Sequence, residues 1–196
     1  MMLVEQTSVP SAALPVTEFK DHLQLGTGFT GDTLQDPVLE NYLRSAIAAI
    51  EARTGKVLIS KSYTWTLTAW REACRQALPL APVGSVDALR ILDRLGAITV
   101  IDPAKYRLEL DMHRPVLWGV GNLATIPLYG TAEVDFTAGH GPAWDDVPDD
   151  LALAVFLLAT HFYENRNGAG GDAMPAAVSS LIQRYRNVRI MGGGAK

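Results

Sequence analysis

The sequence predicts an α+β protein: a helical bundle of about four helices with an inserted small antiparallel β-sheet. Apolar residues recur at helical spacing near both ends of the chain. Between residues 56 and 140 the pattern changes to alternation, and prolines and glycines interrupt it. With 196 residues, of which 48% are hydrophobic and 19% charged, the chain is long enough for one domain with its own core.

We expect a single domain made of consecutive segments. In order, they are an N-terminal arm (1–15), a helical pair (16–55), a β-rich insertion (56–140), a C-terminal helix pair (147–186) and a flexible tail (187–196). The arm carries two prolines and no apolar period, and the tail contains three consecutive glycines. Both ends are therefore expected to lie outside the core.

The helical pair has clear start and stop signals. Residues 17–25 predict a first helix that Thr17 caps and Gly26 ends. A second helix begins at Asp36-Pro37, because a cap residue followed by proline is typical of a helix N-terminus, and Gly55 ends it. Its apolar stripe consists of Leu39, Leu43, Ile47 and Ile50.

The β-rich insertion is predicted from alternation. In residues 61–68, aromatic and aliphatic side chains alternate with serine and threonine, which indicates a half-buried strand. The proline-rich residues 78–83 favour an extended edge or a loop. A turn at 93–96 should join two of the strands as a hairpin. The further strand candidates are 86–92, 97–101, 106–110 and 132–138.

The C-terminal helix pair begins after Val147-Pro148. Residues 149–164 are apolar on nearly every face, so this helix is expected to be buried in a core or against a neighbouring subunit. A glycine-rich loop follows at 167–172. The last helix should begin at Pro175, with a stripe formed by Val178, Leu181, Ile182 and Tyr185.

Composition excludes several classes of protein. The net charge of −4 argues against a general nucleic-acid binder, which normally carries a basic surplus. The single cysteine, Cys74, leaves no disulfide within the chain and no cysteine-rich zinc site. The N-terminus does not resemble a signal peptide, and the longest apolar run is too short to span a bilayer. We expect a protein that is not in the membrane.

No constellation of residues predicts catalysis. His161 and Glu164 stand one helical turn apart, a spacing that can place two metal ligands on one face, but no second pair accompanies them. The acidic residues of 145–150 precede a helix, where capping is the simpler interpretation. Cys74 has no evident base partner. We therefore expect no enzyme, and no catalytic, cofactor-binding or metal-binding residue.

Charge is segregated along the chain. Six acidic residues and no Lys or Arg occupy 133–150, whereas 173–196 carries Arg184, Arg186, Arg189 and Lys196 and no acid. Both segments could simply be solvated. Alternatively, the acidic and basic segments meet between copies in a head-to-tail contact, which closes into a ring if its rotation allows.

Several short passages follow one another along nearly the whole chain. They are the first-helix sequence 15–23, the helix exit 50–58, the proline passage 78–83 after Trp70, the strand and turn 134–141 before Val147-Pro148, and the helix-pair sequences 161–166 and 174–178 with Leu181 and Tyr185-Arg186. Their order and spacing resemble the head–tail connector (adaptor) family of long-tailed phages and gene transfer agents. Met174 stands where that family tends to have leucine.

The resemblance implies a structural subunit of a virion or phage-like particle. It implies a homo-oligomeric ring, typically dodecameric, that joins the capsid portal to the tail and continues the DNA channel. The partners would be the portal protein, a tail-proximal stopper or terminator ring, and further copies of the chain. DNA would be only passing channel content, and no cofactor or membrane is implied. The chain would act at the neck of the particle, after a stay in the host cytoplasm during assembly.

Interface residues can be named from residue type and position. Tyrosine and arginine are favoured at interfaces, and an apolar residue in the tail could order on a partner by adding a strand to the portal. The candidates are Tyr163, Arg166, Tyr185, Arg186, Arg189 and Ile190.

Several alternatives stay open. One is a tail-completion or stopper ring of the same neck, and another is a generic oligomer outside any virion. A third is a small metal-dependent hydrolase that uses His161, Glu164 and the acidic residues of 145–150. An infectious phage and a gene transfer agent are equally compatible with the sequence.

Overall fold

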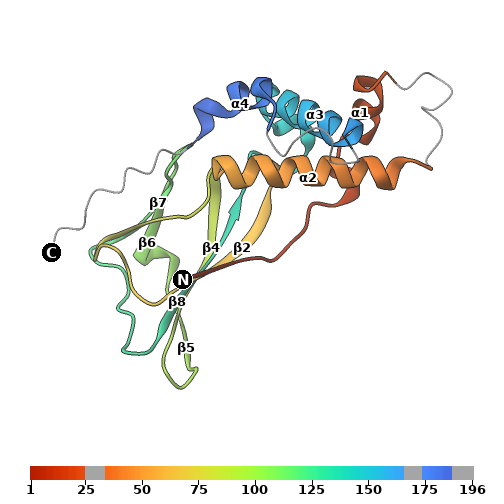
Figure 1. The fold of residues 1–196 in the computed structure, drawn as a ribbon. Coiled ribbons are helices and arrows are strands. Elements are labelled where there is room, and N and C mark those ends of the chain that lie inside the picture. The colour runs from red at the N-terminus through yellow and green to blue at the C-terminus, as the bar shows by residue number, and fades with distance from the viewer. Residues whose placement is uncertain (25–33, 166–173, 187–196) are drawn as a thin grey trace.

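The computed structural model describes residues 1–24, 34–165 and 174–186. In these residues four α-helices form a layer at one end of the molecule, and the strands extend away from it (Figure 1). The predicted α+β class is confirmed, and the helical bundle stays a prediction. The β-structure is larger than the small insert expected, because the described strands form a five-stranded and a three-stranded sheet.

Local sequence signals determine the ends of the longest helix. The four helices are α1 (Val16–His22), α2 (Asp36–Thr54), α3 (Asp149–Glu164) and α4 (Ala176–Ile182). Helix α2 begins at Asp36-Pro37 with proline in its first turn, as predicted, but Asp36 lies inside the helix and Gln35 takes the cap position without a side-chain hydrogen bond. It ends at Gly55, whose left-handed φ of 68° lets its N–H donate to the Glu51 carbonyl oxygen.

Helix α1 differs from the sequence prediction at both ends. It begins at Val16 after Pro15, and Thr17 lies inside the helix and does not cap it. It ends at His22, before the expected Leu25, because Gln24 already has a positive φ of 53°. Proline and a left-handed residue therefore determine this helix, not a hydroxyl cap.

Within one chain, helix α3 is buried on one face only, and burial of its other face against a neighbouring subunit stays a prediction. Leu151, Val155 and Leu158 are at most 1% exposed, whereas Leu153 is 44% exposed. The buried face packs against α2 and α4. Phe156 stacks on Phe19 of α1, with the ring centroids 5.8 Å apart. The helical layer thus has a core of its own.

The five-stranded sheet is antiparallel throughout and has the order β1-β2-β8-β4-β5. Its strands are β1 (Met2–Glu5), β2 (Lys61–Leu67), β4 (Val83–Leu92), β5 (Ile98–Val100) and β8 (Thr131–Ala138). A tight turn after Leu92 joins β4 to β5, as predicted. The N-terminal arm contains β1, which pairs with β2 at the edge of the sheet. This strand was not predicted, because all four of its residues are exposed and give no alternating pattern.

The second sheet has three strands in the order β3-β7-β6: β3 (Arg75–Ala77), β6 (Tyr106–Glu109) and β7 (Val116–Gly119). Only β6 was predicted from the sequence. Buried side chains of both sheets form one cluster, in which Trp65 and Leu89 of the larger sheet join Leu117 of β7. The two sheets therefore pack face to face as a sandwich, and their other faces point outward.

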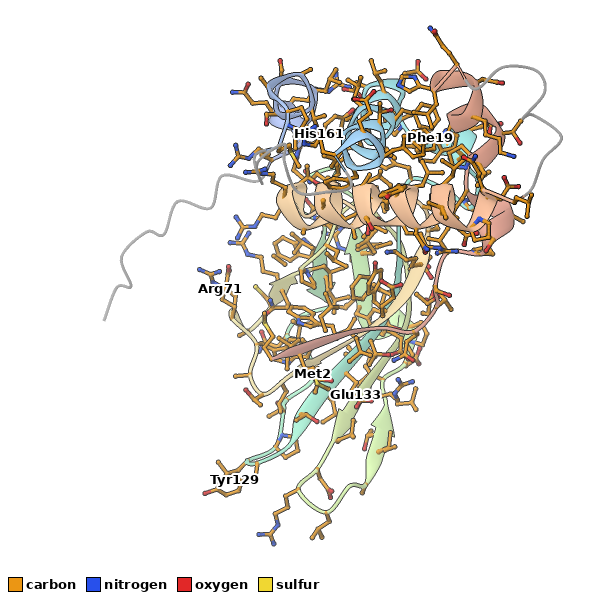
Figure 2. The ribbon with its side chains drawn as sticks, turned by 45° about the vertical axis from the view of Figure 1, so that its right-hand side comes forward. Met2, Phe19, Arg71, Tyr129, Glu133 and His161 are labelled. Carbon is orange, nitrogen blue, oxygen red and sulfur yellow. The ribbon has the colours of Figure 1, made fainter. Side chains whose placement is uncertain are left out.

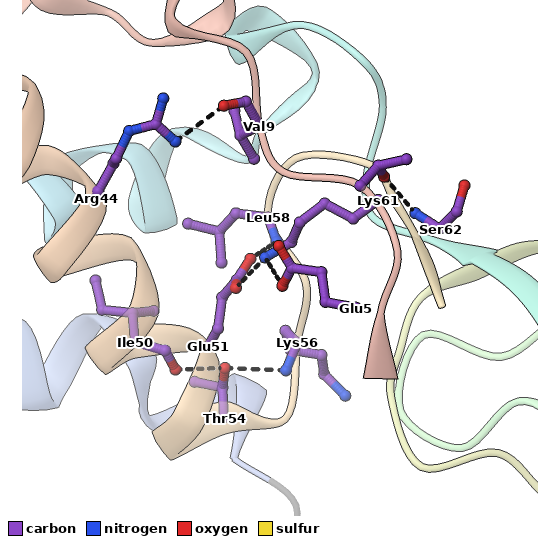
Figure 3. Close-up of polar contacts among 11 residues, drawn as sticks. Glu5, Val9, Arg44, Ile50, Glu51, Thr54, Lys56, Leu58, Lys61 and Ser62 are labelled. Atoms are coloured by element: carbon purple, nitrogen blue, oxygen red, sulfur yellow. Dashed lines mark hydrogen bonds and ion pairs between the residues drawn. The ribbon is translucent and has the colours of Figure 1, made fainter. Parts of the chain in front are cut away.

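An ion-pair cluster joins the helical layer to the strands (Figure 3). The carboxylate of Glu51 in α2 accepts from the backbone N–H of Leu58 at 2.8 Å and from Lys61 Nζ at 2.9 Å. Lys61, in β2, also bonds Glu5 Oε2 of β1 at 3.1 Å. We call Glu5, Glu51 and Lys61 the junction cluster.

Burial and charge act against each other in the junction cluster. Burial raises the pKa of Glu51, and this effect outweighs the attraction of Lys61. Burial alone would lower the pKa of Lys61, yet the two carboxylates raise it above its ordinary value. Lys61 therefore stays charged, and its charge is stabilised mainly by Glu51.

Candidate interaction surfaces

The residues considered for metal binding lie at the end of α3. The side-chain amide nitrogen of Asn165 lies 3.1 Å from His161 Nδ1, and the His161 ring also lies against Phe162. In the part of the chain that the structure describes, no three His, Cys, Asp or Glu side chains are grouped so that they could hold a metal ion.

None of the described helices is both long enough and apolar enough to cross a membrane.

The acidic residues before α3 act in local structure. Asp146 Oδ2 accepts from the backbone N–H of Ala143 at 3.0 Å. Asp149 and Asp150 lie in the first turn of α3, where carboxylates interact favourably with the free N–H groups. The capping interpretation of these residues agrees with this geometry.

Part of the acidic segment meets the basic segment within one chain. Asp150 Oδ1 accepts from the Tyr185 hydroxyl at 2.7 Å, and Asp150 Oδ2 lies 2.7 Å from Arg184 Nη2. The guanidinium carbon of Arg184 lies 4.7 Å from the centre of the Tyr185 ring. Burial raises the pKa of Tyr185. These contacts hold the chain after α4 against the start of α3, so this pair of segments has an intramolecular role.

The predicted interface residues lie in different settings. Tyr163 is half-buried and packs edge-on against Tyr42, with the ring centroids 5.9 Å apart. Tyr185 is 5% exposed and belongs to the contact with Asp150, whereas Arg186 is exposed. Arg166, Arg189 and Ile190 lie outside the described residues. An interface role for all six residues stays a prediction.

The outer side of the five-stranded sheet carries a carboxylate cluster. On β8, Glu133 and Asp135 alternate with the buried Ala132, Val134 and Phe136, and so they point away from the core. Arg90 of β4 lies between them, bonded to Asp135 Oδ2 and 3.4 Å from Glu133 Oε2. Asp87 accepts from the Thr137 hydroxyl at 3.0 Å on the same side. We call Asp87, Arg90, Glu133 and Asp135 the acidic face.

The acidic face is hollowed into an open cleft of about 590 Å³. Thr64 donates to Asp135 Oδ1 at 2.7 Å and accepts from Gln6 Nε2 at 3.2 Å. The cleft is lined by Gln6, Ser62, Tyr63, Thr64, Asp87, Arg90, Glu133 and Asp135. Three carboxylates face one arginine here, so the cleft has a negative charge surplus.

The outer side of the three-stranded sheet carries the opposite charge. Trp118 of β7 stands directly opposite Arg75 of β3 and Arg107 of β6 in the strand register. The two guanidinium carbons lie 5.4 and 5.7 Å from the centre of the Trp118 ring. Arginine on the face of an aromatic ring is held in place without losing its hydrogen-bonding capacity.

Two further arginines extend this surface. A hydrogen bond from Arg75 lowers the pKa of Glu72, and the nearby charges of Arg114 and Arg71 lower it further. All four arginines are exposed. We call Arg71, Arg75, Arg107, Arg114 and Trp118 the arginine face. Its four arginines outnumber the three carboxylates beside them, Glu72, Glu109 and Asp111.

The two faces lie on opposite sides of the sandwich, because each is the outward side of a sheet whose inward side is in the shared core. In Figure 2, Arg71 lies at the left edge of the strands and Glu133 lies toward their right. The sequence indicated the acidic run but not its pairing with Arg90. The arginine face was missed because β3 and β7 were not predicted. Its one signal was the exposed Arg107 between Tyr106 and Leu108 in a predicted strand.

Solved structures contain chains that resemble this one over nearly its whole length. A chain in the neck of an empty GTA particle, computed with C6 symmetry, is 52% identical, with a TM-score of 0.91. A chain in the virion of a native gene transfer agent (GTA) particle is also 52% identical, with a TM-score of 0.89. A chain in the neck of a native GTA particle, computed with C12 symmetry, is 49% identical, with a TM-score of 0.86. Each match covers 98% of this chain and 99% of the other.

No family model matches the sequence, and a comparison with curated proteins finds no match.

Proposed function

We propose a structural role in a particle neck on one premise: this chain belongs to the same family as the matching chains in the necks and virion of gene transfer agent particles. The single observation that carries the proposal is identity of about half the residues over almost the full length of both chains. The same fold is therefore present over nearly the whole length of both chains. We therefore propose that this chain is a structural subunit and not an enzyme.

Within the neck, the proposed role is that of the adaptor. The chain forms a ring, typically of twelve copies, which joins the capsid portal to the tail and continues the DNA channel. The six-fold and twelve-fold symmetry of the matching neck structures supports a ring of identical subunits. The order of the connector-like passages along the sequence supports the adaptor over the other rings of a neck.

The proposed ring contacts the portal through the C-terminal helix pair and the tail. Tyr163 and Arg186 stand near the ends of the two helices, Arg166 lies between the helices in sequence, and Arg189 and Ile190 follow them. Tyr185 contributes indirectly, by holding the chain after α4 on Asp150. In this proposal the C-terminal helix pair faces the portal and the sandwich faces the neighbouring copies.

Binding to the purified portal protein of the same particle tests the proposal. An adaptor binds the portal alone, and electron microscopy of the complex should show a ring of this chain with the symmetry of the portal. A stopper ignores the portal and binds only after another ring is in place, so that result would replace the adaptor role. Absence of the chain from purified necks would overturn the structural role itself.

A further inference from the structure

We propose that neighbouring copies of this chain contact one another through the acidic face of one copy and the arginine face of the next. The inference rests on the proposed ring, and it names the two surfaces through which neighbouring subunits of that ring contact each other. The occupant of each face is therefore a second copy of this chain, and the contact is head-to-tail.

The first argument is charge complementarity. The acidic face has three carboxylates and one arginine, and the arginine face has four arginines beside three carboxylates. Each face therefore repels a copy of itself and attracts the other. Complementary surfaces of this kind determine the register of two partners and suppress wrong pairings.

The second argument is the placement of the faces. They are the two outer sides of one sandwich, so a contact between them joins different surfaces on the two partners. Such a heterologous contact repeats from copy to copy and generates a closed ring when its rotation allows. Contact between the same face on two copies would instead give a closed dimer. The like charges of that face would oppose such a dimer.

The third argument is the chemistry of the side chains. Arg75 and Arg107 are stacked on Trp118, which limits the side-chain freedom that they would lose on binding. Arginine and tryptophan are the residues that most often contribute strongly to binding at interfaces. On the opposing face, carboxylate oxygens in an open cleft offer acceptors to a planar guanidinium group.

DNA in the channel is the competing occupant of the arginine face. Phosphate attraction would slow passing DNA, and a chain with a net charge of −4 repels phosphate overall. DNA also leaves the acidic face without a partner, whereas a second copy accounts for both faces at once. The observations therefore favour the neighbouring copy.

Charge reversal of one face and of both faces tests the contact. The acidic-face variant carries Asp87→Lys and Glu133→Lys, the arginine-face variant carries Arg71→Glu and Arg107→Glu, and a third variant carries all four substitutions. A control, Glu18→Lys with Asp21→Lys, makes the same change in net charge as the acidic-face variant but on exposed positions of α1. Each variant replaces the native chain in particle-producing cells, and its amount in purified necks is measured by quantitative immunoblotting.

Each single-face variant should lower neck occupancy more than about tenfold, because like charges then oppose each other at every contact. The four-substitution variant restores complementarity with reversed polarity, and its occupancy should return to within about threefold of the wild type. The control should match the wild type. Thermal unfolding of the purified variants checks that each folds, and recovery in the four-substitution variant excludes misfolding as the cause of loss.

Two other outcomes would overturn the inference and leave the proposed function intact. In the first, the wild type is present in necks and both single-face variants are present at the same level. In the second, the arginine-face variant assembles normally but its particles transfer less DNA, which assigns the arginine face to DNA. Absence of the wild type itself from necks would remove the proposed function instead.

Discussion

Lys61 connects three elements through side-chain contacts, since it bonds Glu51 of α2 and Glu5 of β1 from its own place in β2. Its side chain is 8% exposed and that of Glu51 is 15% exposed, whereas Glu5 is 44% exposed. The pair with Glu51 is thus the buried part of the cluster. A buried ion pair adds little compared with an apolar pair, but loss of one partner leaves a buried charge uncompensated.

This asymmetry gives a prediction for Lys61→Met. We expect the free energy of unfolding to fall by about 3 kcal/mol, because Glu51 keeps its buried charge without Lys61. The double variant Glu51→Gln/Lys61→Met should be more stable than Lys61→Met alone, since glutamine can still accept from the Leu58 N–H. Urea unfolding of both variants measures the difference. A double variant less stable than the single would contradict this account.

His140 gives a second prediction at the residue scale. It lies between β8 and α3, and its Nε2 atom is buried without a hydrogen-bond partner among the described residues. Burial lowers the pKa of His140 from 6.5, the charge of Lys56 lowers it further, and Asp150 only partly opposes them. The folded state therefore binds fewer protons at this site than the unfolded state.

It follows that stability falls as the pH is lowered through 6.5, and that the loss is complete once the folded state is also protonated. Well above pH 6.5 the imidazole is neutral in both states, so His140 no longer contributes to the pH dependence of stability. His140→Gln should remove this part of the pH dependence, so the difference in unfolding free energy between the wild type and the variant should change between about pH 7.5 and about pH 5. A constant difference over that interval would show that His140 titrates normally.

At the scale of elements, the sequence predicts the helices and strands whose start, stop or alternation signals lie within their own residues. The start of α2 at Asp36-Pro37 and its end at Gly55 depend on local backbone chemistry, and both are confirmed. Strands β3 and β7 have three and four residues, and their pairing partners, not their own pattern, make them strands. For the same reason the outward direction of Glu133 and Asp135 follows from alternation, but their contact with Arg90 depends on strand register.

The unpredicted strand β1 leads to a prediction for the element as a whole. A chain that lacks residues 1–4 should fold, because the side chains of β1 are exposed and lie outside the buried clusters. It should lose about 2 kcal/mol of unfolding free energy with the backbone hydrogen bonds to β2. The matched control Leu3→Ala/Val4→Ala keeps the backbone pairing and should lose much less. Urea unfolding compares the two, and an equal loss would assign the effect to the side chains.

At the scale of the whole molecule, the two layers have separate cores, which suits the proposed role of one chain that contacts several partners. The helical layer and the sandwich have separate buried clusters, joined by the junction cluster. The sandwich turns opposite charges to opposite sides, so copies can repeat around an axis without using the helical layer. In the proposed ring, the portal contact and the contact between copies can thus use different surfaces of the same chain.

A ring held together by exposed charges should respond to ionic strength. At about 0.1 M salt the screening length is about 10 Å, and at about 1 M it is about 3 Å, so attraction between the acidic and arginine faces should weaken steeply over this range. Portal-bound rings washed with increasing sodium chloride should therefore release subunits, measured as the amount of chain retained per portal. The four-substitution variant should show the same salt dependence, because its charges are reversed but equal in number. If retention does not change with salt, contacts between copies depend chiefly on apolar burial, and the charged faces only orient the approach of the subunits.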